Sequence, residues 1–228
     1  MRRSSPGLIG LTVILIALIC VGVCFLVHWY DDVNRSVTYT RLSTYAYQGN
    51  DVAIEMMLTR GADVNFTLEK GNAPTVLASA VDGRHAATVR LLLGAGANPN
   101  ATAAGLSPLY GAIRHGDTEI IKALLDHGAH IDERCLVKAI QGRNPALLAL
   151  LLSSGGDPNV LLWSAAKSGD VALLRLSLAA ATARARRDPA TSPKLMIGQA
   201  MSLAKRNGHA NVVRILEAYR RQSADRAK

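Results

Sequence analysis

The sequence predicts an all-α protein in which about six helix pairs stack into a solenoid behind one transmembrane helix. Three observations predict this fold class. An uncharged apolar stretch lies near the N-terminus, a short glycine-containing phrase recurs along the remaining chain, and each recurrence follows a leucine-rich run. Because one helix pair cannot bury its apolar face alone, several such pairs must stack to be stable.

The N-terminal stretch predicts a membrane anchor. No Asp, Glu, Lys or Arg occurs between Ser4 and Tyr30, and residues 8–27 read LIGLTVILIALICVGVCFLV. Twenty helical residues span about 30 Å, the thickness of the hydrocarbon layer of a bilayer. A cleaved signal peptide is the alternative, but its apolar region spans about 7 to 15 residues and ends in small residues. We therefore expect an uncleaved signal anchor over residues 8–29.

The flanking charges predict the orientation of this anchor. Arg2 and Arg3 precede it and two aspartates follow it, which favours a cytoplasmic tail over residues 1–7. Because the rule counts Lys and Arg, Arg35 on the far side weakens the prediction. We expect a single-pass protein of the inner membrane, with a juxtamembrane linker over 30–40 and the remaining chain in the periplasm.

The charge distribution argues against a nucleic-acid partner. The chain carries 26 basic and 17 acidic residues, a net charge of +9. Eleven basic and three acidic residues fall between 183 and 228, whereas residues 31–182 are nearly neutral. A phosphate backbone requires Lys and Arg on one face of the folded part. Nucleic acid or an anionic membrane, bound through the basic C-terminal region with its Arg184, Arg186 and Arg187, remains an alternative partner.

One phrase recurs four times and marks the helix pairs. Its glycines at 61, 96, 128 and 155 are spaced 35, 32 and 27 residues apart, and a leucine-rich run precedes each copy. The copies are RGADVN at 60–65, GAGANPN at 94–100, HGAHID at 127–132 and SGGDPN at 154–159.

The best-formed unit shows how the sequence encodes one helix pair. Ser107 can cap a first helix with Pro108 at its first position, and Gly116 ends that helix. Asp117 can cap a second helix whose apolar residues recur three and four positions apart. Gly128 then supplies the left-handed residue that ends this second helix.

These units resemble the ankyrin repeat, a turn and helix pair of about 33 residues with a T-P-L-H-x-A phrase. Residues 107–112, Ser-Pro-Leu-Tyr-Gly-Ala, match that phrase with serine and tyrosine substituted. The resemblance implies an ankyrin-repeat domain over 41–221 and a polar tail over 222–228. With Ala112 as the reference residue, the equivalents in the other five units are Tyr45, Ser79, Ala139, Ala165 and Ala204.

The fifth unit departs from the pattern because no hairpin phrase follows it. We expect a lengthened helix or an inserted loop across 182–193, with Pro189 and Pro193 ending helices.

Catalytic and cofactor motifs are missing from the sequence. It holds no phosphate-binding glycine loop, H-E-x-x-H, G-x-S-x-G or paired CxxC motif, which argues against an enzyme and a small-molecule substrate. His127 and His130, with Asp126, Asp132 and Glu133 nearby, lie across a turn and do not form a recognisable metal site. We expect no metal and no cofactor.

The resemblance instead implies a protein partner bound on the concave face, by the hairpin tips and the exposed ends of the first helices. The candidates carried over are chemically varied, as a specificity surface would be, although a merely solvated face gives the same mixture. Tyr110 and Trp163 occupy the histidine column of the phrase, where they either pack between repeats or touch the partner. The other candidates are Tyr47, Gln48, Asp82, Arg114, His115, Gln141, Lys167 and Arg206.

A small membrane-tethered array of this kind is similar to bacterial membrane-anchored ankyrin-repeat proteins. Among these are immunity proteins that neutralise secreted toxins such as lipases, so we expect an inhibitory role without catalysis. A periplasmic scaffold for an envelope or stress enzyme is the rival hypothesis.

Overall fold

The computed structural model describes the backbone of residues 6–68, 73–187 and 196–225, and the side chains of 23–68, 73–186 and 196–223. In these residues the chain forms twelve α-helices and no β-strand, apart from an isolated bridge between Ala103 and Leu106. The predicted all-α class is therefore confirmed. The chain divides into two compact units, Met1–Asn98 and Pro99–Lys228.

The first unit contains two helix pairs. Its helices are α1 (Pro6–Gln48), α2 (Asp51–Thr59), α3 (Val76–Asp82) and α4 (Ala86–Gly94). The last part of α1 serves as the inner helix of the first pair, because its Leu42 and Ala46 are buried where α1 packs on α3. Hydroxyl groups join the same two helices, with the Oγ atoms of Ser43 and Ser79 2.7 Å apart.

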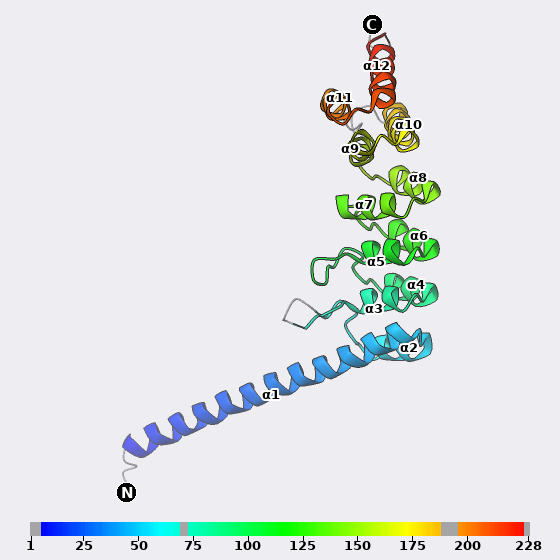
Figure 1. Cartoon of the computed structure of the whole chain (residues 1–228). Coiled ribbons are helices and arrows are strands. Elements are labelled where there is room, and N and C mark those ends of the chain that lie inside the picture. Colours follow the sequence, from blue (N-terminus) through cyan, green and yellow to red (C-terminus); the bar gives the residue numbers. More distant parts are fainter. Residues whose placement is uncertain (1–5, 69–72, 188–195, 226–228) are drawn as a thin grey trace, which may run out of the picture. The chain divides into compact units, whose positions relative to one another are not determined.

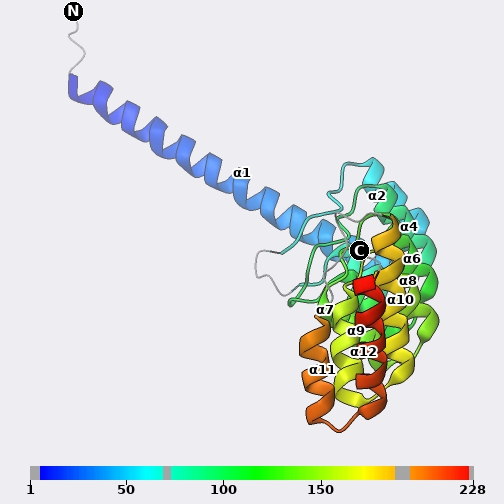
Figure 2. The ribbon, with the colours of Figure 1, turned by 90° about the horizontal axis from the view of Figure 1, so that it is seen from above.

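The N-terminal part of α1 extends away from the rest of its unit (Figure 2). The helix runs without a break through 30–40, the segment expected to be a linker. From Val23 to Tyr30 its apolar side chains are exposed, Phe25 by 71%. The side chains of residues 8–22, most of the expected membrane segment, lie outside the described part. Within the described residues, no helix combines the length and the apolar character needed to span a bilayer.

The second unit stacks four helix pairs in two layers. In Figures 1 and 2 the inner helices α5, α7, α9 and α11 line one side, and the outer helices α6, α8, α10 and α12 line the other. Buried leucines such as Leu109, Leu124 and Leu151 fill the space between the layers, and each contributes about 1.5–3 kcal/mol by leaving water. The helices are α5 (Pro108–His115), α6 (Thr118–Asp126), α7 (Glu133–Gln141), α8 (Pro145–Ser153), α9 (Pro158–Ser168), α10 (Val171–Arg187), α11 (Ile197–Arg206) and α12 (Ala210–Asp225).

Most local signals of the best-formed unit are confirmed, although Asp117 occupies the N-cap position of α6 without a capping hydrogen bond to its side chain. The side chain of Ser107 accepts a hydrogen bond from the Tyr110 N–H, 3.2 Å from Oγ, and Pro108 is the first residue of α5. Gly116 ends that helix at a φ of +75°. Gly128 follows α6 at a φ of +82°. Glycine is favoured at both positions because side chains with a Cβ rarely adopt this left-handed backbone.

The reference residue of the second pair is Ala80, and the choice of Ser79 was wrong by one position. The His85 N–H bonds to the Ala80 carbonyl, just as the Asp117 N–H bonds to the Ala112 carbonyl in the third pair. Arg84, rather than Gly83, takes the left-handed backbone with a φ of +62°. Gly83 is required for a different reason, since a Cβ there would collide with the Tyr47 carbonyl.

The fifth pair contains a lengthened helix, one of its two expected forms. α10 runs for 17 residues, and its buried Ser177 donates a hydrogen bond to the Pro158 carbonyl at 2.8 Å. Because that bond satisfies a buried hydroxyl, it helps to hold α10 against α9. Pro189 and Pro193 lie outside the described residues.

The hairpin asparagines join consecutive repeats. In the first unit, Nδ2 of Asn65 donates to the Gly96 carbonyl at 2.9 Å, and Oδ1 accepts from the Asn98 N–H at 2.8 Å. One side-chain amide thus supplies a hydrogen-bond partner to two backbone groups that the turn leaves unpaired. This role accounts for the asparagine that closes the first hairpin phrase.

Candidate protein-binding surface

One exposed side chain per helix pair lies two positions after the reference residue of each inner helix. We call these six the row residues: Tyr47, Asp82, Arg114, Gln141, Lys167 and Arg206. Tyr47 and Asp82 belong to the first unit, and the other four belong to the second.

The row residues are exposed because the inner helices turn a different face to the core. In the first unit Val81 is buried while the next residue, Asp82, is exposed. In the second unit Ile113 and Ala166 are buried directly before Arg114 and Lys167. Packing therefore constrains the neighbours of the row residues and leaves the chemistry of the row residues themselves open.

Within the second unit the row residues lie at the same end of parallel helices. At one end of the inner layer, Ser107, which caps the start of α5, hydrogen-bonds with Cys135 of α7. At the other end, the Lys167 carbonyl of α9 contacts His209 just after α11. Because consecutive inner helices also pack on one another, their C-terminal ends, and hence the row residues, are neighbours.

The row of the second unit is cationic and polar. Arg114, Lys167 and Arg206 lie in the last turns of their helices, where the helix dipole favours positive charge. In the described residues of α5, α7, α9 and α11, Glu133 is the sole acidic side chain, and it lies in the first turn of α7. The row ends of these helices thus present cations with no acidic residue beside them on the same helix.

The remaining candidates differ in exposure. Gln48 is exposed beside Tyr47, whereas His115 is half-buried, with its Nε2 3.2 Å from Nη2 of Arg114. Tyr110 and Trp163 are both half-buried. Part of each ring therefore packs against the protein and part faces solvent. Each ring can thus both pack between repeats and touch a partner.

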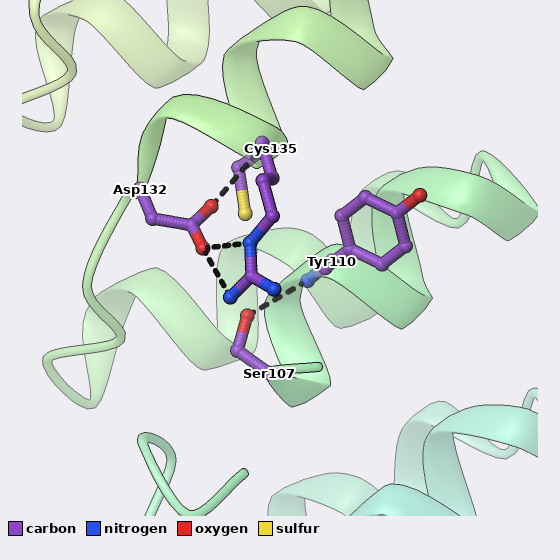
Figure 3. Close-up of polar contacts among 5 residues, drawn as sticks. Ser107, Tyr110, Asp132 and Cys135 are labelled. Carbon is purple, nitrogen blue, oxygen red and sulfur yellow. Dashed lines mark hydrogen bonds and ion pairs between the residues drawn. The ribbon is translucent and has the colours of Figure 1, made fainter. Parts of the chain in front are cut away.

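A polar cluster lies at the opposite end of the inner helices (Figure 3). The Asp132 carboxylate caps α7 by accepting from the Cys135 N–H at 2.8 Å, and it pairs with Arg134 at 3.0 Å. Burial opposes the charge of Asp132, but the hydrogen bonds from Cys135 and Arg134 leave its pKa below the ordinary value. Tyr110 contributes only its backbone N–H, and its ring points away from the cluster.

The cluster does not supply a nucleophile at neutral pH. Burial, followed by the neighbouring Asp132, raises the pKa of the Cys135 thiol to about 12. The thiolate is the reactive form of cysteine, so Cys135 stays in its inert, protonated form. Because it is buried, Cys135 serves as a small apolar side chain of the core.

The histidines near the third hairpin have structural partners. Nδ1 of His127 lies 2.8 Å from the Ala123 carbonyl, and the His130 N–H donates to Asn100. Across the described side chains, no three His, Cys, Asp or Glu residues gather closely enough to hold a metal ion.

Comparison with known proteins identifies the repeats. Residues 42–135 match the family model of ankyrin repeats in three copies. The matched segment covers α2 to α6 together with the inner end of α1 and the start of α7. Residues 42–135 are therefore similar to ankyrin repeats, and the ankyrin family is in general a non-enzymatic module for protein–protein interaction.

Three relatives match part of this chain at similar identity. Dynein axonemal heavy chain 12 of Bos taurus is 30% identical over 119 residues, covering 46% of this chain and 33% of the relative. An ankyrin repeat protein of Fowlpox virus, FPV244, is 31% identical over 134 residues, covering 57% and 20%. Ankyrin repeat and SOCS box protein 14 of Mus musculus is 35% identical over 119 residues, covering 46% and 20%. The chain thus spans about a third or less of each relative.

Proposed function

Because residues 42–135 match the family model of ankyrin repeats, we propose that this chain is a membrane-tethered module that binds a protein partner through the row residues of its second unit. The observation that carries the proposal is the row of the second unit: Arg114, Gln141, Lys167 and Arg206 are exposed at equivalent positions of its inner helices. A rigid array that presents varied side chains loses little conformational entropy on docking, which favours specific binding without a reactive centre.

The charge of the row specifies the partner surface. Arg114, Lys167 and Arg206 share one end of the inner layer in the second unit. Cations in such an arrangement attract an acidic surface, and they raise its association rate as well as its affinity. The proposed partner therefore presents acidic side chains to this unit.

The sequence and exposure of α1 support the membrane tether. Residues 8–27 carry no charge. The described residues that follow expose large apolar side chains, with Leu26 exposed by 62% and Tyr30 by 66%. Apolar surface of this extent on a helix that projects from its unit requires a cover, and a bilayer supplies one.

In this proposal the repeats lie in the periplasm and neutralise a secreted toxin, such as a lipase, by occluding it. The support is the arginine pair before the apolar segment and the resemblance to bacterial membrane-anchored immunity proteins. A scaffold would instead keep a constitutive partner. Two enzyme reporters fused to the C-terminus test the location, one that is active only outside the cytoplasm and one that is active only inside it. Activity of the first reporter supports the proposal, and activity of the second reporter alone overturns it.

Charge reversal tests the surface. The double variant Arg114→Glu, Lys167→Glu should lower partner capture from detergent-solubilised membranes at least about tenfold, since it replaces attraction by repulsion. Its free energy of unfolding should change by less than about 0.5 kcal/mol because both positions are exposed. The matched control is Arg220→Glu, Arg221→Glu on α12, which should capture the partner normally. Equal capture by all three proteins would show that the row is the wrong surface.

A further inference from the structure

A groove of about 560 Å³ opens in the first unit, away from the row residues. One wall is the side of α1 from Asn34 to Tyr45, and the other is formed by the end of α2 and the following hairpin as far as Phe66. Neither Tyr47 nor Asp82 lines it. Its volume is in the range typical of ligand-binding clefts.

The floor of the groove is apolar. Tyr39 and Leu42 are buried in it, and the rings of Tyr39 and Phe66 meet at a centroid distance of 6.0 Å and an angle of 58°. Met56 also lines the groove and is 49% exposed. A ligand with an apolar group would therefore remove exposed methionine and aromatic surface from water.

The rim of the groove is cationic. Arg35, Arg41 and Arg60 are exposed around it, and within the described side chains none of the three forms an ion pair. Asp63 is the one acidic residue among the lining side chains, and its Oδ1 already accepts from the Asn65 N–H at 2.8 Å. Three guanidinium groups against one carboxylate thus leave the rim with a net positive charge around an apolar floor.

We propose that this groove binds a short, extended, acidic segment of a partner protein. Carboxylates of the segment pair with the rim arginines, and an apolar side chain between them covers Met56 and the aromatic floor. The wall from Asn34 to Tyr45 is about 16 Å long at the helical rise, which about five extended residues match. Arginine suits this role because its planar group binds a carboxylate through two parallel hydrogen bonds.

Reach along α1 favours a peptide over a lipid headgroup. If α1 leaves the membrane near Tyr30, the polar layer beyond the hydrocarbon is about 5 to 8 Å thick. Arg35 lies about 8 Å beyond Tyr30 along the helix, whereas Arg41 lies about 16 Å beyond it. A headgroup could therefore reach the first arginine but not the remainder of the groove.

A labelled peptide tests the proposal with the full chain in detergent micelles. The probe is a fluorescein-labelled hexapeptide that alternates glutamate with leucine, and binding is followed by fluorescence anisotropy. Arg41→Gln with Arg60→Gln should weaken binding at least about tenfold, because two charge-assisted contacts are lost. The control Arg220→Gln, Arg221→Gln on α12 should bind as the unmodified chain does. An affinity within about twofold of the unmodified chain for the groove variant would overturn the proposal.

Three further measurements separate the ligand classes. A lysine–leucine peptide should not bind, and Met56→Ser should weaken the glutamate–leucine probe while leaving a polyglutamate peptide unaffected. The row variant Arg114→Glu, Lys167→Glu should bind the probe normally. A failure of the groove proposal, measured by probe binding, is therefore distinguishable from a failure of the proposed function, measured by partner capture. A soluble short-chain phosphatidylglycerol that displaces the probe at lower concentration than unlabelled peptide, through Arg41 and Arg60, would overturn the peptide proposal in favour of a lipid.

Discussion

The Nε2 atom of His209 lies 3.0 Å from the carbonyl oxygen of Lys167. The sixth helix pair therefore caps the end of α9 in the fifth, where a helix leaves carbonyl groups without an internal partner. The backbone of a row residue is thus held by the next repeat, while its side chain remains exposed. Because the contact uses only the backbone of Lys167, the side chain at this position can vary without changing the contact.

The same histidine should make Gly169 unusually sensitive to substitution. Gly169 and Gly116 both end inner helices at left-handed φ values, +78° and +75°. A Cβ at Gly169 would meet Nδ1 of His209 at 2.6 Å, whereas a Cβ at Gly116 would meet nothing within 4 Å. Gly116→Ala should cost about 1–2 kcal/mol of unfolding free energy from backbone strain alone, and Gly169→Ala should cost clearly more.

Urea unfolding in detergent measures both alanine variants. The double variant Gly169→Ala, His209→Ala should lose less stability than the two single variants predict together, because the collision is gone. Equal losses for the two glycine variants would show that the imidazole moves aside at no cost.

The Asn100 amide should stabilise the link between the hairpins that precede and follow the third helix pair. Its Nδ2 donates to the Gly128 carbonyl at 3.0 Å, and its Oδ1 accepts from the His130 N–H at 2.7 Å. Asn100→Ala should lower the unfolding free energy by about 1–3 kcal/mol, since two backbone groups lose their partner. The exposed Asn211→Ala serves as the control. A loss no larger than that of the control would mean that water replaces the amide.

The raised pKa of Cys135 predicts that stability falls at alkaline pH. The unfolded thiol loses its proton near its ordinary value of 9.0, and the folded thiol keeps its proton up to about 12. Between these values the folded state binds more protons, so the unfolding free energy decreases as pH rises. The unmodified chain should lose more stability between pH 8 and pH 10 than Cys135→Ala does. Parallel pH profiles for the two proteins would contradict the assignment.

The lowered pKa of Asp132 predicts the opposite behaviour in acid. Its folded value lies below the ordinary 3.8, so its contribution is fully present above that pH and is lost as the pH falls through the folded value. Below about pH 4, the unmodified chain should lose stability faster than Asp132→Asn, which keeps an N-cap oxygen but has no charge to lose. An identical acid profile would show that the pair with Arg134 contributes nothing.

The repeat architecture could be predicted from the sequence because the signals that build a helix pair are local. Ser107 caps α5 through a residue three positions away, and Gly116 and Gly128 need only their own backbone angles. Such contacts form within a few residues, so they leave a pattern that can be counted along the chain.

Local signals gave a wrong prediction where a glycine is required by a contact between two helix pairs. Counting four positions on from Ser79, as from Ala112 to Gly116, leads to Gly83 as the left-handed residue of this turn, but Arg84 takes that conformation. Gly83 is required because the Tyr47 carbonyl of the preceding pair approaches it closely. The predicted reference residue of the second pair, Ser79, was therefore wrong by one position, although Asp82 is still one of the row residues.

Which charged residues act together became visible only in the packing of the helices. Arg35 and Arg41 on α1 and Arg60 after α2 are separated by up to 25 residues in the sequence, and they converge on one groove because α2 folds back beside α1. The burial that keeps Cys135 protonated depends in the same way on neighbouring helices. Hydrogen bonds within a helix or turn recur at fixed sequence spacing, whereas contacts between side chains of different helices depend on packing, which leaves no such spacing to count.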